Sequence, residues 1–348
     1  MKNTKRIFAL GTAALMTATL FAGCGDNNAD TNTPASGEDA EAGTNYKIAV
    51  VPKMTTIGWF QRMEVGVKAY NEANGTDYLY GGSPEGADQA AYVETLLAED
   101  WDAICVVPFD SQSLTPVLQK AKEAGVVVIT HEAASMDPQY FDYDIEAFVN
   151  ADYGTNFAKQ LVELTGGEGT YIQFVGDLNS VSHNEWCDAA DAYFAENSKM
   201  TKLGRYETGD DTTASYNQTK ELLQAHPEIN AIEGSASTDV AGAAQAVAEL
   251  GLSGKVAIVG TSMATVCGDY IEDGTIASFS VWDPAEAGKA MIELAIAVLD
   301  AEGELDVAST SLNAAGYETL NAGEGTPTVL YGNARVDVNK DNMADYNF

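Results

Sequence analysis

The chain has 348 residues and carries 18 basic against 52 acidic side chains, a formal net charge of −34. A surface this acidic repels phosphate backbones and anionic lipid headgroups, so we expect no nucleic acid as a partner. The length is that of two domains or one large one.

The beginning of the chain predicts export. Basic residues precede an apolar run over 7–21, which small residues and Cys24 close. An apolar run this short is typical of a signal peptide and does not span a membrane. The Ala-Gly-Cys ending resembles a bacterial lipobox, so we expect a signal peptide over 1–23 and a lipid on Cys24. The alternative is an ordinary signal peptide with an incidental cysteine.

Residues 24–45 form a polar segment with almost no large apolar side chain. Such a segment buries too little surface to offset its ordering entropy, so we expect a flexible tether. The folded body would then lie on the extracytoplasmic face of the cell membrane, in a periplasm or at the cell surface. The lipid would be its only membrane contact.

From Tyr46 onward, apolar runs alternate regularly with amphipathic segments. Strands are expected at 47–53, 77–82, 103–108, 126–132, 170–177, 202–209, 231–235, 256–262 and 278–283. Helices are expected at 59–73, 87–99, 113–124, 152–165, 184–196, 213–225, 238–250, 264–272 and 285–300. Unbroken apolar strands separated by helices predict an α/β fold with doubly wound parallel sheets. The pattern pauses over 133–150, which predicts a crossing between two lobes.

Ligands of open parallel sheets bind beyond the carboxyl ends of the strands. Polar and charged groups follow the predicted strands, and aromatic residues stand near them. Such a mixture suits a polyhydroxylated ligand, because hydroxyls need donors and acceptors while the C–H face of a sugar packs on aromatic rings. The candidate ligand-binding residues from this argument are Lys53, Trp59, Phe60, His131, Glu132, Asp177, Ser235, Ser237, Asp239 and Trp282.

Enzyme, cofactor and metal signatures are missing from the sequence. There is no G-x-S-x-G nucleophile motif and no phosphate-binding P-loop. The glycine-rich segment 81–86 has the wrong spacing for a dinucleotide and is interpreted as a turn. His183 and Cys187 have a helical spacing, but no further ligand is near, so we expect no metal. The cysteines beyond Cys24 are odd in number and predict no disulfide framework.

Several segments together resemble one family. The chain is similar to the ribose-binding (type I periplasmic binding protein) group of sugar-binding proteins of ABC importers, and within it to the autoinducer-2- and rhamnose-binding branch. The similarity extends from Tyr46 to Phe348. Its elements are IAVVPKMTTIGWF (48–60), NEW (184–186), AGAAQAVAEL (241–250), VAIVGTS (256–262), FSVWDPAEAGKA (279–290) and ARVDVNKDNMADYNF (334–348).

The resemblance implies two α/β lobes that are joined by a hinge and close on a ligand. On this pattern, residues 46–148 with 284–304 form the N-terminal lobe. Residues 149–283 with roughly 305–348 form the C-terminal lobe and the hinge crossings. It also implies delivery of the ligand to a membrane permease, by a protein that we expect to be monomeric.

The resemblance also implies which residues bind the ligand. Lys53 matches the lysine that autoinducer-2 binders place after their first strand, while Phe60 and Trp282 match aromatic residues of the family pocket. Glu132 stands where the family has aspartate, which keeps the acceptor chemistry but moves the oxygens. These matches imply a pocket related to that of the autoinducer-2 binders, with a different size or a different ligand.

Other positions depart from the autoinducer-2 pattern. Ser182 and His183 replace an Asp-Gln pair, and Ser235 and Ser237 replace proline and alanine. The additional hydroxyl and imidazole groups favour a ligand with more hydroxyls, such as a pentose, a deoxyhexose or a polyol.

The sequence therefore predicts a lipid-anchored solute-binding protein that delivers a sugar to an ABC importer without catalysis. One alternative is a sensor subunit that presents an autoinducer-2-like signal to a chemoreceptor or histidine kinase. Another is a nucleoside-binding lipoprotein. The export signal and the lack of a basic headpiece argue against a transcriptional repressor.

Overall fold

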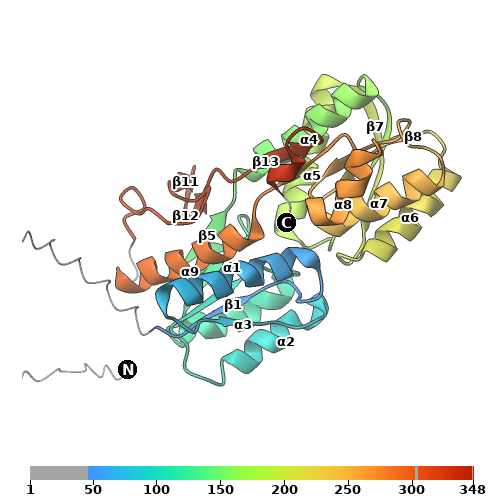
Figure 1. Ribbon diagram of the computed structural model, residues 1–348. Coiled ribbons are helices and arrows are strands. Elements are labelled where there is room, and N and C mark those ends of the chain that lie inside the picture. The colour runs from blue at the N-terminus through green and yellow to red at the C-terminus, as the bar shows by residue number, and fades with distance from the viewer. Residues whose placement is uncertain (1–45, 302–304, 347) are drawn as a thin grey trace, which may run out of the picture. The chain divides into compact units, whose positions relative to one another are not determined.

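The computed structural model describes residues 46–301, 305–346 and 348 (Figure 1). The predictions of a signal peptide, of lipid attachment at Cys24 and of a tether over 24–45 lie outside these described residues. None of the helices in the described part is long and apolar enough to cross a membrane.

The first sheet has the strand order β11-β12-β5-β4-β3-β1-β2, and its strands are parallel except for β11. Its strands are β1 (Ile48–Val51), β2 (Leu79–Tyr80), β3 (Ala103–Val106), β4 (Val127–Thr130), β5 (Tyr143–Glu146), β11 (Asn321–Gly323) and β12 (Thr326–Tyr331). Its helices are α1 (Gly58–Asn74), α2 (Gln89–Leu96), α3 (Ser111–Glu123) and α9 (Pro284–Asp300), with 3₁₀ turns at Gly86–Asp88 and Pro138–Tyr140.

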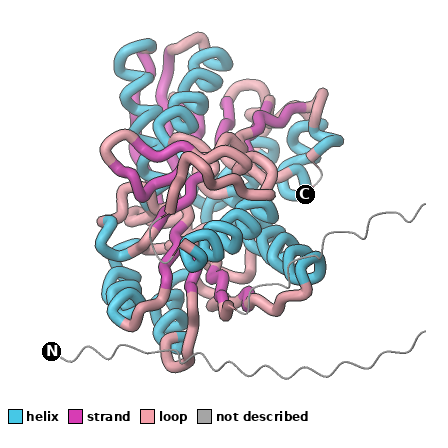
Figure 2. Tube along the Cα trace, turned by 90° about the vertical axis from the view of Figure 1, so that its left-hand side faces the viewer, coloured by secondary structure: helices cyan, strands magenta, loops and turns pink. Residues whose placement is uncertain are grey.

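Helices cover both faces of this sheet, which explains the continuous apolar strands (Figure 2). In β1, Ile48 and Val50 pack in the core with α1 and α9. Ala49 and Val51 point to the opposite face and pack in a separate core with α2 and α3. Because successive side chains of a strand alternate between faces, every residue of β1 is buried.

The second sheet is parallel, with the order β7-β6-β8-β9. Its strands are β6 (Glu168–Val175), β7 (Lys199–Glu207), β8 (Ile229–Gly234) and β9 (Ala257–Gly260). Its helices are α4 (Asn150–Thr165), α5 (Val181–Asn197), α6 (Thr212–Ala225), α7 (Ser237–Glu249) and α8 (Ala264–Glu272), and Met343–Asp345 forms a 3₁₀ turn. The antiparallel pair β10 (Ser278–Val281) and β13 (Val336–Asn339) adjoins β9 through a bridge from Thr261 to Ser280.

The chain passes from one sheet to the other at 147–149, at 282–283 and at 332–335. The predicted α/β fold with two parallel sheets is therefore confirmed. Two local features differ from the expectation. The segment 133–150 is more than a crossing, since it contains β5. Residues 321–331, which the sequence analysis grouped with the C-terminal lobe, belong to the first sheet, where β12 pairs with β5 and β11 pairs with β12.

Close helix contacts position the aromatic residues between the sheets. A Cβ atom at Gly66 of α1 would lie 2.1 Å from the backbone oxygen of Ala285 in α9. A Cβ atom at Gly154 of α4 would lie 2.0 Å from the backbone oxygen of Trp186 in α5. Only glycine allows backbones to approach this closely. The two contacts hold α1 against α9 and α4 against α5, and Trp59 lies in α1, Trp186 in α5 and Trp282 two residues before α9.

Candidate functional site

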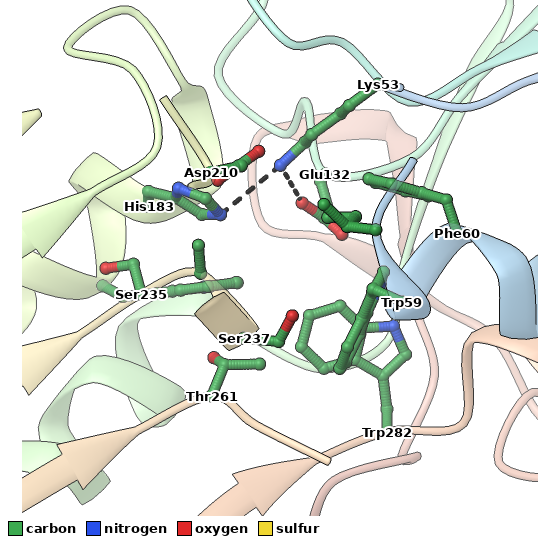
Figure 3. A pocket seen from close by; sticks show the side chains of 13 residues that line it. Lys53, Trp59, Phe60, Glu132, His183, Asp210, Ser235, Ser237, Thr261 and Trp282 are labelled. Atoms are coloured by element: carbon green, nitrogen blue, oxygen red, sulfur yellow. Dashed lines mark hydrogen bonds and ion pairs between the residues drawn. The ribbon is translucent and has the colours of Figure 1, made fainter. Parts of the chain in front are cut away.

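A cavity lies at the carboxyl ends of strands from both sheets (Figure 3). The lining residues come from segments that follow β1, β4, β6, β7, β8, β9 and β10. They are Lys53, Ile57, Trp59, Phe60, Glu132, His183, Trp186, Asp210, Ser235, Ala236, Ser237, Thr261 and Trp282.

An ion pair joins the ends of β1 and β4. Lys53 Nζ donates a hydrogen bond of 2.6 Å to Glu132 Oε2, and the two side chains are only 3% and 4% exposed. Burial alone would lower the pKa of Lys53, but the carboxylates of Glu132 and Asp210 outweigh it, so the pKa is raised and the ammonium stays charged. Glu132 adopts a φ of 60°, a left-handed conformation that is unfavourable for this residue type. In this conformation its side chain reaches Lys53.

The second sheet contributes an imidazole to the cavity from α5. His183 Nδ1 accepts a hydrogen bond of 3.1 Å from the backbone N–H of Gly176, and Nε2 lies 3.4 Å from Lys53 Nζ. Burial and the neighbouring Lys53 ammonium hold the pKa of His183 well below its usual value. The ring is therefore neutral at physiological pH.

Asp210, just after β7, is a cavity residue that the sequence analysis missed. Its side chain is buried, its φ is 53°, and Oδ1 has no hydrogen-bond partner among the described residues. Burial raises the pKa of Asp210 to about 6, although the Lys53 ammonium opposes the shift. Its place after a predicted strand, within the sequence Gly-Asp-Asp, was the available signal.

Hydroxyl groups lie on the second-sheet side of the cavity (Figure 3). Ser235 and Ser237 follow β8, and Thr261 follows β9. Ser235 Oγ is 3.5 Å from the thiol of Cys187, and Thr261 Oγ1 is 3.1 Å from the hydroxyl of Tyr153. These groups can both donate and accept hydrogen bonds, so they suit a ligand that does the same.

Tryptophan rings form the apolar part of the cavity lining. Trp59 and Trp282 meet edge to face with centroids 4.5 Å apart, and Trp186 lies 5.9 Å from Trp282. Phe60 also lines the cavity. Trp282 Nε1 is buried and has no hydrogen-bond partner among the described residues.

Some predicted site residues lie behind the lining. Ser182 Oγ donates to Glu132 Oε2 at 3.3 Å, and so connects α5 to the ion pair. His131 Nδ1 contacts the backbone oxygen of Ile145, and its ring packs edge to face on Trp282. Both side chains are buried and support lining residues instead of facing the cavity.

Two predicted acidic residues are also outside the lining. Asp239 accepts hydrogen bonds from Thr208 Oγ1 at 2.6 Å and from the backbone N–H of Ala236 at 2.9 Å, which fixes the loop that carries the cavity serines. Asp177 is half-buried and accepts from the backbone N–H of Asn179. Both aspartates organise loops at the sheet edge.

The described residues contain no group of three or more side chains that could hold a metal ion. Two parallel α/β sheets with a small polar and aromatic cavity at their carboxyl ends define a two-lobed protein that binds a solute. Residues 48–304 match the family described as periplasmic binding protein domain, and the chain belongs to this family of non-enzymatic solute-binding proteins.

Curated relatives include sugar-binding proteins. The D-ribose/D-allose-binding protein of Pseudomonas aeruginosa is 27% identical over 259 residues, which cover 70% of this chain and 79% of the relative. The xylitol-binding protein of Mycolicibacterium smegmatis is 26% identical over 310 residues, or 86% and 81%. The D-xylose-binding periplasmic protein of Escherichia coli is 25% identical over 299 residues, or 82% and 84%.

Solved structures share the fold. An ABC transporter solute-binding protein from Clostridium phytofermentans with bound L-rhamnose has a TM-score of 0.80 and 21% identity, and the match covers 87% of this chain and 98% of that one. LsrB from Clostridium saccharobutylicum in complex with AI-2 has a TM-score of 0.79 and 20% identity, with coverage of 87% and 100%.

Proposed function

We propose that this protein binds a small sugar or polyol in the cavity and delivers it to the permease of an ABC importer. The observation that carries the proposal is the composition of the cavity. An ion pair comes from the first sheet, an imidazole, a carboxyl and hydroxyls come from the second, and tryptophan rings form the wall. This is the chemistry that a ring with several hydroxyls requires.

The relatives support a carbohydrate. The names of the curated relatives specify ribose, allose, xylose and xylitol, and the similar structures hold L-rhamnose or AI-2. Ser235, Ser237 and His183 bring several hydrogen-bonding groups into the cavity. We therefore favour a pentose, a deoxyhexose or a polyol over autoinducer-2.

The tryptophan geometry argues against a nucleoside. A base is held best between parallel aromatic faces, whereas Trp59 and Trp282 meet at an interplanar angle of 71° and their centroids are 4.5 Å apart. The pair leaves no slot between two rings. It forms a corner against which the apolar face of a small ring can pack.

Closure around the ligand would provide part of the affinity. Each sheet supplies only some of the polar groups, so the full set of contacts exists only when the lobes are together, and ligand shifts the population toward that state. The crossings at 147–149, 282–283 and 332–335 would form the hinge. Micromolar affinity corresponds to about −8 kcal/mol, which a few charge-assisted hydrogen bonds and aromatic packing can provide.

The proposed place of action is the extracytoplasmic face of a cell membrane. Export by residues 1–23 and a lipid on Cys24 would keep the protein near its permease, and a monomer suffices for hinge closure. Presentation of the ligand to a sensor would use the same cavity, so both roles share the binding step.

A thermal-shift screen tests the proposal. Ligand-free protein is heated with pentoses, hexoses, deoxysugars, polyols, autoinducer-2, nucleosides and amino acids. A ligand at a hundredfold its Kd adds about 2.7 kcal/mol, or about 5–11 °C for lobes of this size. Stabilisation by a sugar or polyol alone supports the proposal. Stabilisation by a nucleoside or amino acid alone, or by nothing in the panel, contradicts it.

A further inference from the structure

Two hydrogen bonds to His183 cannot both form. The neutral imidazole carries one N–H and one acceptor nitrogen. The backbone N–H of Gly176 points to Nδ1 at 3.1 Å, so Nδ1 is the acceptor and Nε2 carries the hydrogen. Nε2 lies 3.4 Å from Lys53 Nζ, whose ammonium has no acceptor site. Two donors therefore face each other in the cavity.

The other tautomer of His183, with the hydrogen on Nδ1, is less favourable. If Nδ1 carried the hydrogen, it would face the buried N–H of Gly176, and a backbone N–H has no freedom to turn away. The Lys53 ammonium can rotate, and Glu132 already accepts one of its hydrogens. The unsatisfied contact therefore lies between Lys53 and His183, where an oxygen atom that accepts from both would resolve it.

Asp210 supplies the complementary group beside these donors. A Cβ atom at Gly176 would lie 2.0 Å from Asp210 Oδ1, so the carboxyl packs on the same residue that bonds to His183. Oδ1 is buried without a partner, and Figure 3 shows Asp210 next to Lys53 and His183. A buried acceptor without a donor is unfavourable until a ligand supplies one.

We propose that Lys53, His183 and Asp210 form a subsite for one hydroxyl group of the ligand. The hydroxyl oxygen accepts from Lys53 Nζ and from His183 Nε2–H, while its hydrogen is donated to Asp210 Oδ1. A carboxylate on the ligand cannot donate, and Asp210 and Glu132 would repel it. The subsite rests on the proposed function, because the hydroxyl that it recognises belongs to the sugar or polyol proposed as the ligand.

The tautomer can be measured without a ligand. In protein labelled with ¹⁵N-histidine, three side chains contribute, and His183→Gln assigns the resonances of His183. We expect a protonated Nε2 and an unprotonated Nδ1 between pH 5 and pH 8. A protonated Nδ1, or a doubly protonated ring, would overturn the inference whatever the protein binds.

Ligand analogues test the hydroxyl itself. The probes are D-ribose, D-xylose, L-rhamnose and xylitol, each compared with its monodeoxy and mono-O-methyl derivatives by calorimetry. At one hydroxyl position of the sugar, removal of the hydroxyl and its O-methylation should each weaken binding to the wild-type protein by about tenfold or more. The O-methyl derivative loses affinity because it cannot donate a hydrogen bond to Asp210.

Variants then locate that hydroxyl. In His183→Leu the penalty for the same deoxy analogue should shrink several-fold, and His183→Gln, which retains an N–H donor, should restore much of it. His226→Gln, at an exposed histidine, is the matched control. Equal penalties in wild type and His183→Leu would refute the subsite. If neither these probes nor any other sugar or polyol of the thermal-shift screen binds, the proposed function fails and the subsite fails with it. Binding without a position-specific penalty refutes the subsite alone.

Discussion

Lys53 Nζ lies 2.6 Å from Glu132 Oε2 in an ion pair that is almost completely buried. The pair connects the ends of β1 and β4 and is neutral as a whole, so an uncharged ligand can lie beside it without bringing a compensating charge. Ser182 extends the pair to α5, on the side of the second sheet.

Removal of the Lys53 charge should affect stability and binding together. In Lys53→Met the Glu132 carboxylate stays buried without its partner, so the free energy of unfolding should fall by about 3–5 kcal/mol. Ligand affinity should fall at least about tenfold, since the ammonium is the only cation lining the cavity among the described residues. Urea denaturation and calorimetry measure the two effects.

The double variant separates these effects. Lys53→Met with Glu132→Gln removes both charges, so its stability should exceed that of Lys53→Met alone while binding stays weak. The single variant Glu132→Gln completes the comparison. If the stability losses of Lys53→Met and Glu132→Gln simply add in the double variant, the two side chains do not form the buried pair.

Affinity should depend on pH through Asp210, whose pKa burial raises to about 6. The ionised carboxylate is the form that accepts from a ligand hydroxyl, so binding should weaken as pH falls below 6, by at most about tenfold per pH unit. The titratable groups around it are Lys53, Glu132, Asp177, His183 and Asp239.

Asp210→Asn is the control for this pH dependence. The amide does not titrate, so the affinity of the variant should be weaker at pH 7.5 and nearly constant between pH 7.5 and pH 5. An unchanged acid loss in Asp210→Asn would assign the titration to another group.

Ligand binding should change the intrinsic tryptophan fluorescence. Trp59, Trp186 and Trp282 line the cavity, whereas Trp101 packs with the Lys47 ammonium at 4.3 Å from its ring centroid. Trp101→Phe should keep the ligand-dependent signal, and Trp282→Phe should reduce it. A signal lost only in Trp101→Phe would place the ligand elsewhere.

Gly66 in α1 should tolerate no side chain. Gly66→Ala would push the helix against the Ala285 backbone, and overpacking of this kind lowers the free energy of unfolding by about 1–3 kcal/mol. Gly58 lies in the same helix, and a Cβ atom added there would have no neighbour within 4 Å, so Gly58→Ala should have little effect. Thermal unfolding of both variants gives the comparison, and equal Tm values would contradict the packing.

Cys24 should determine the cellular location. With Cys24→Ser the proposed lipid cannot be attached, so the protein should move from the membrane fraction to the extracytoplasmic fluid or the medium. Fractionation and detergent partitioning measure this. A variant that stays in the membrane fraction would argue against a lipid on this residue.

The regular elements could be predicted because strands and helices have different hydrophobic periodicities. Every predicted helix is present, the one at 264–272 with the predicted bounds and the others with shifted ends. The strand β5 was missed because its sequence YDIE places Asp144 and Glu146 in a buried strand. Burial raises the pKa of both carboxyls, which favours their neutral forms and makes the position possible, and no periodicity reveals this.

The site was predictable as far as the rule of strand ends applies. Lys53, Glu132 and Ser235 follow strands and line the cavity. The rule does not give orientation: Asp239 turns back to bond to Thr208, while Asp210, left out of the prediction, points into the cavity. The difference lies in backbone conformation, since Asp210 adopts a positive φ that the sequence does not specify.

A crystal structure of the protein with the sugar that binds best in the thermal screen tests the central claim most directly. The account predicts one sugar molecule between the sheets, against Trp59 and Trp282, with one hydroxyl shared by Lys53, His183 and Asp210. A sugar bound outside this cavity, or an empty cavity at saturating concentration, would contradict it.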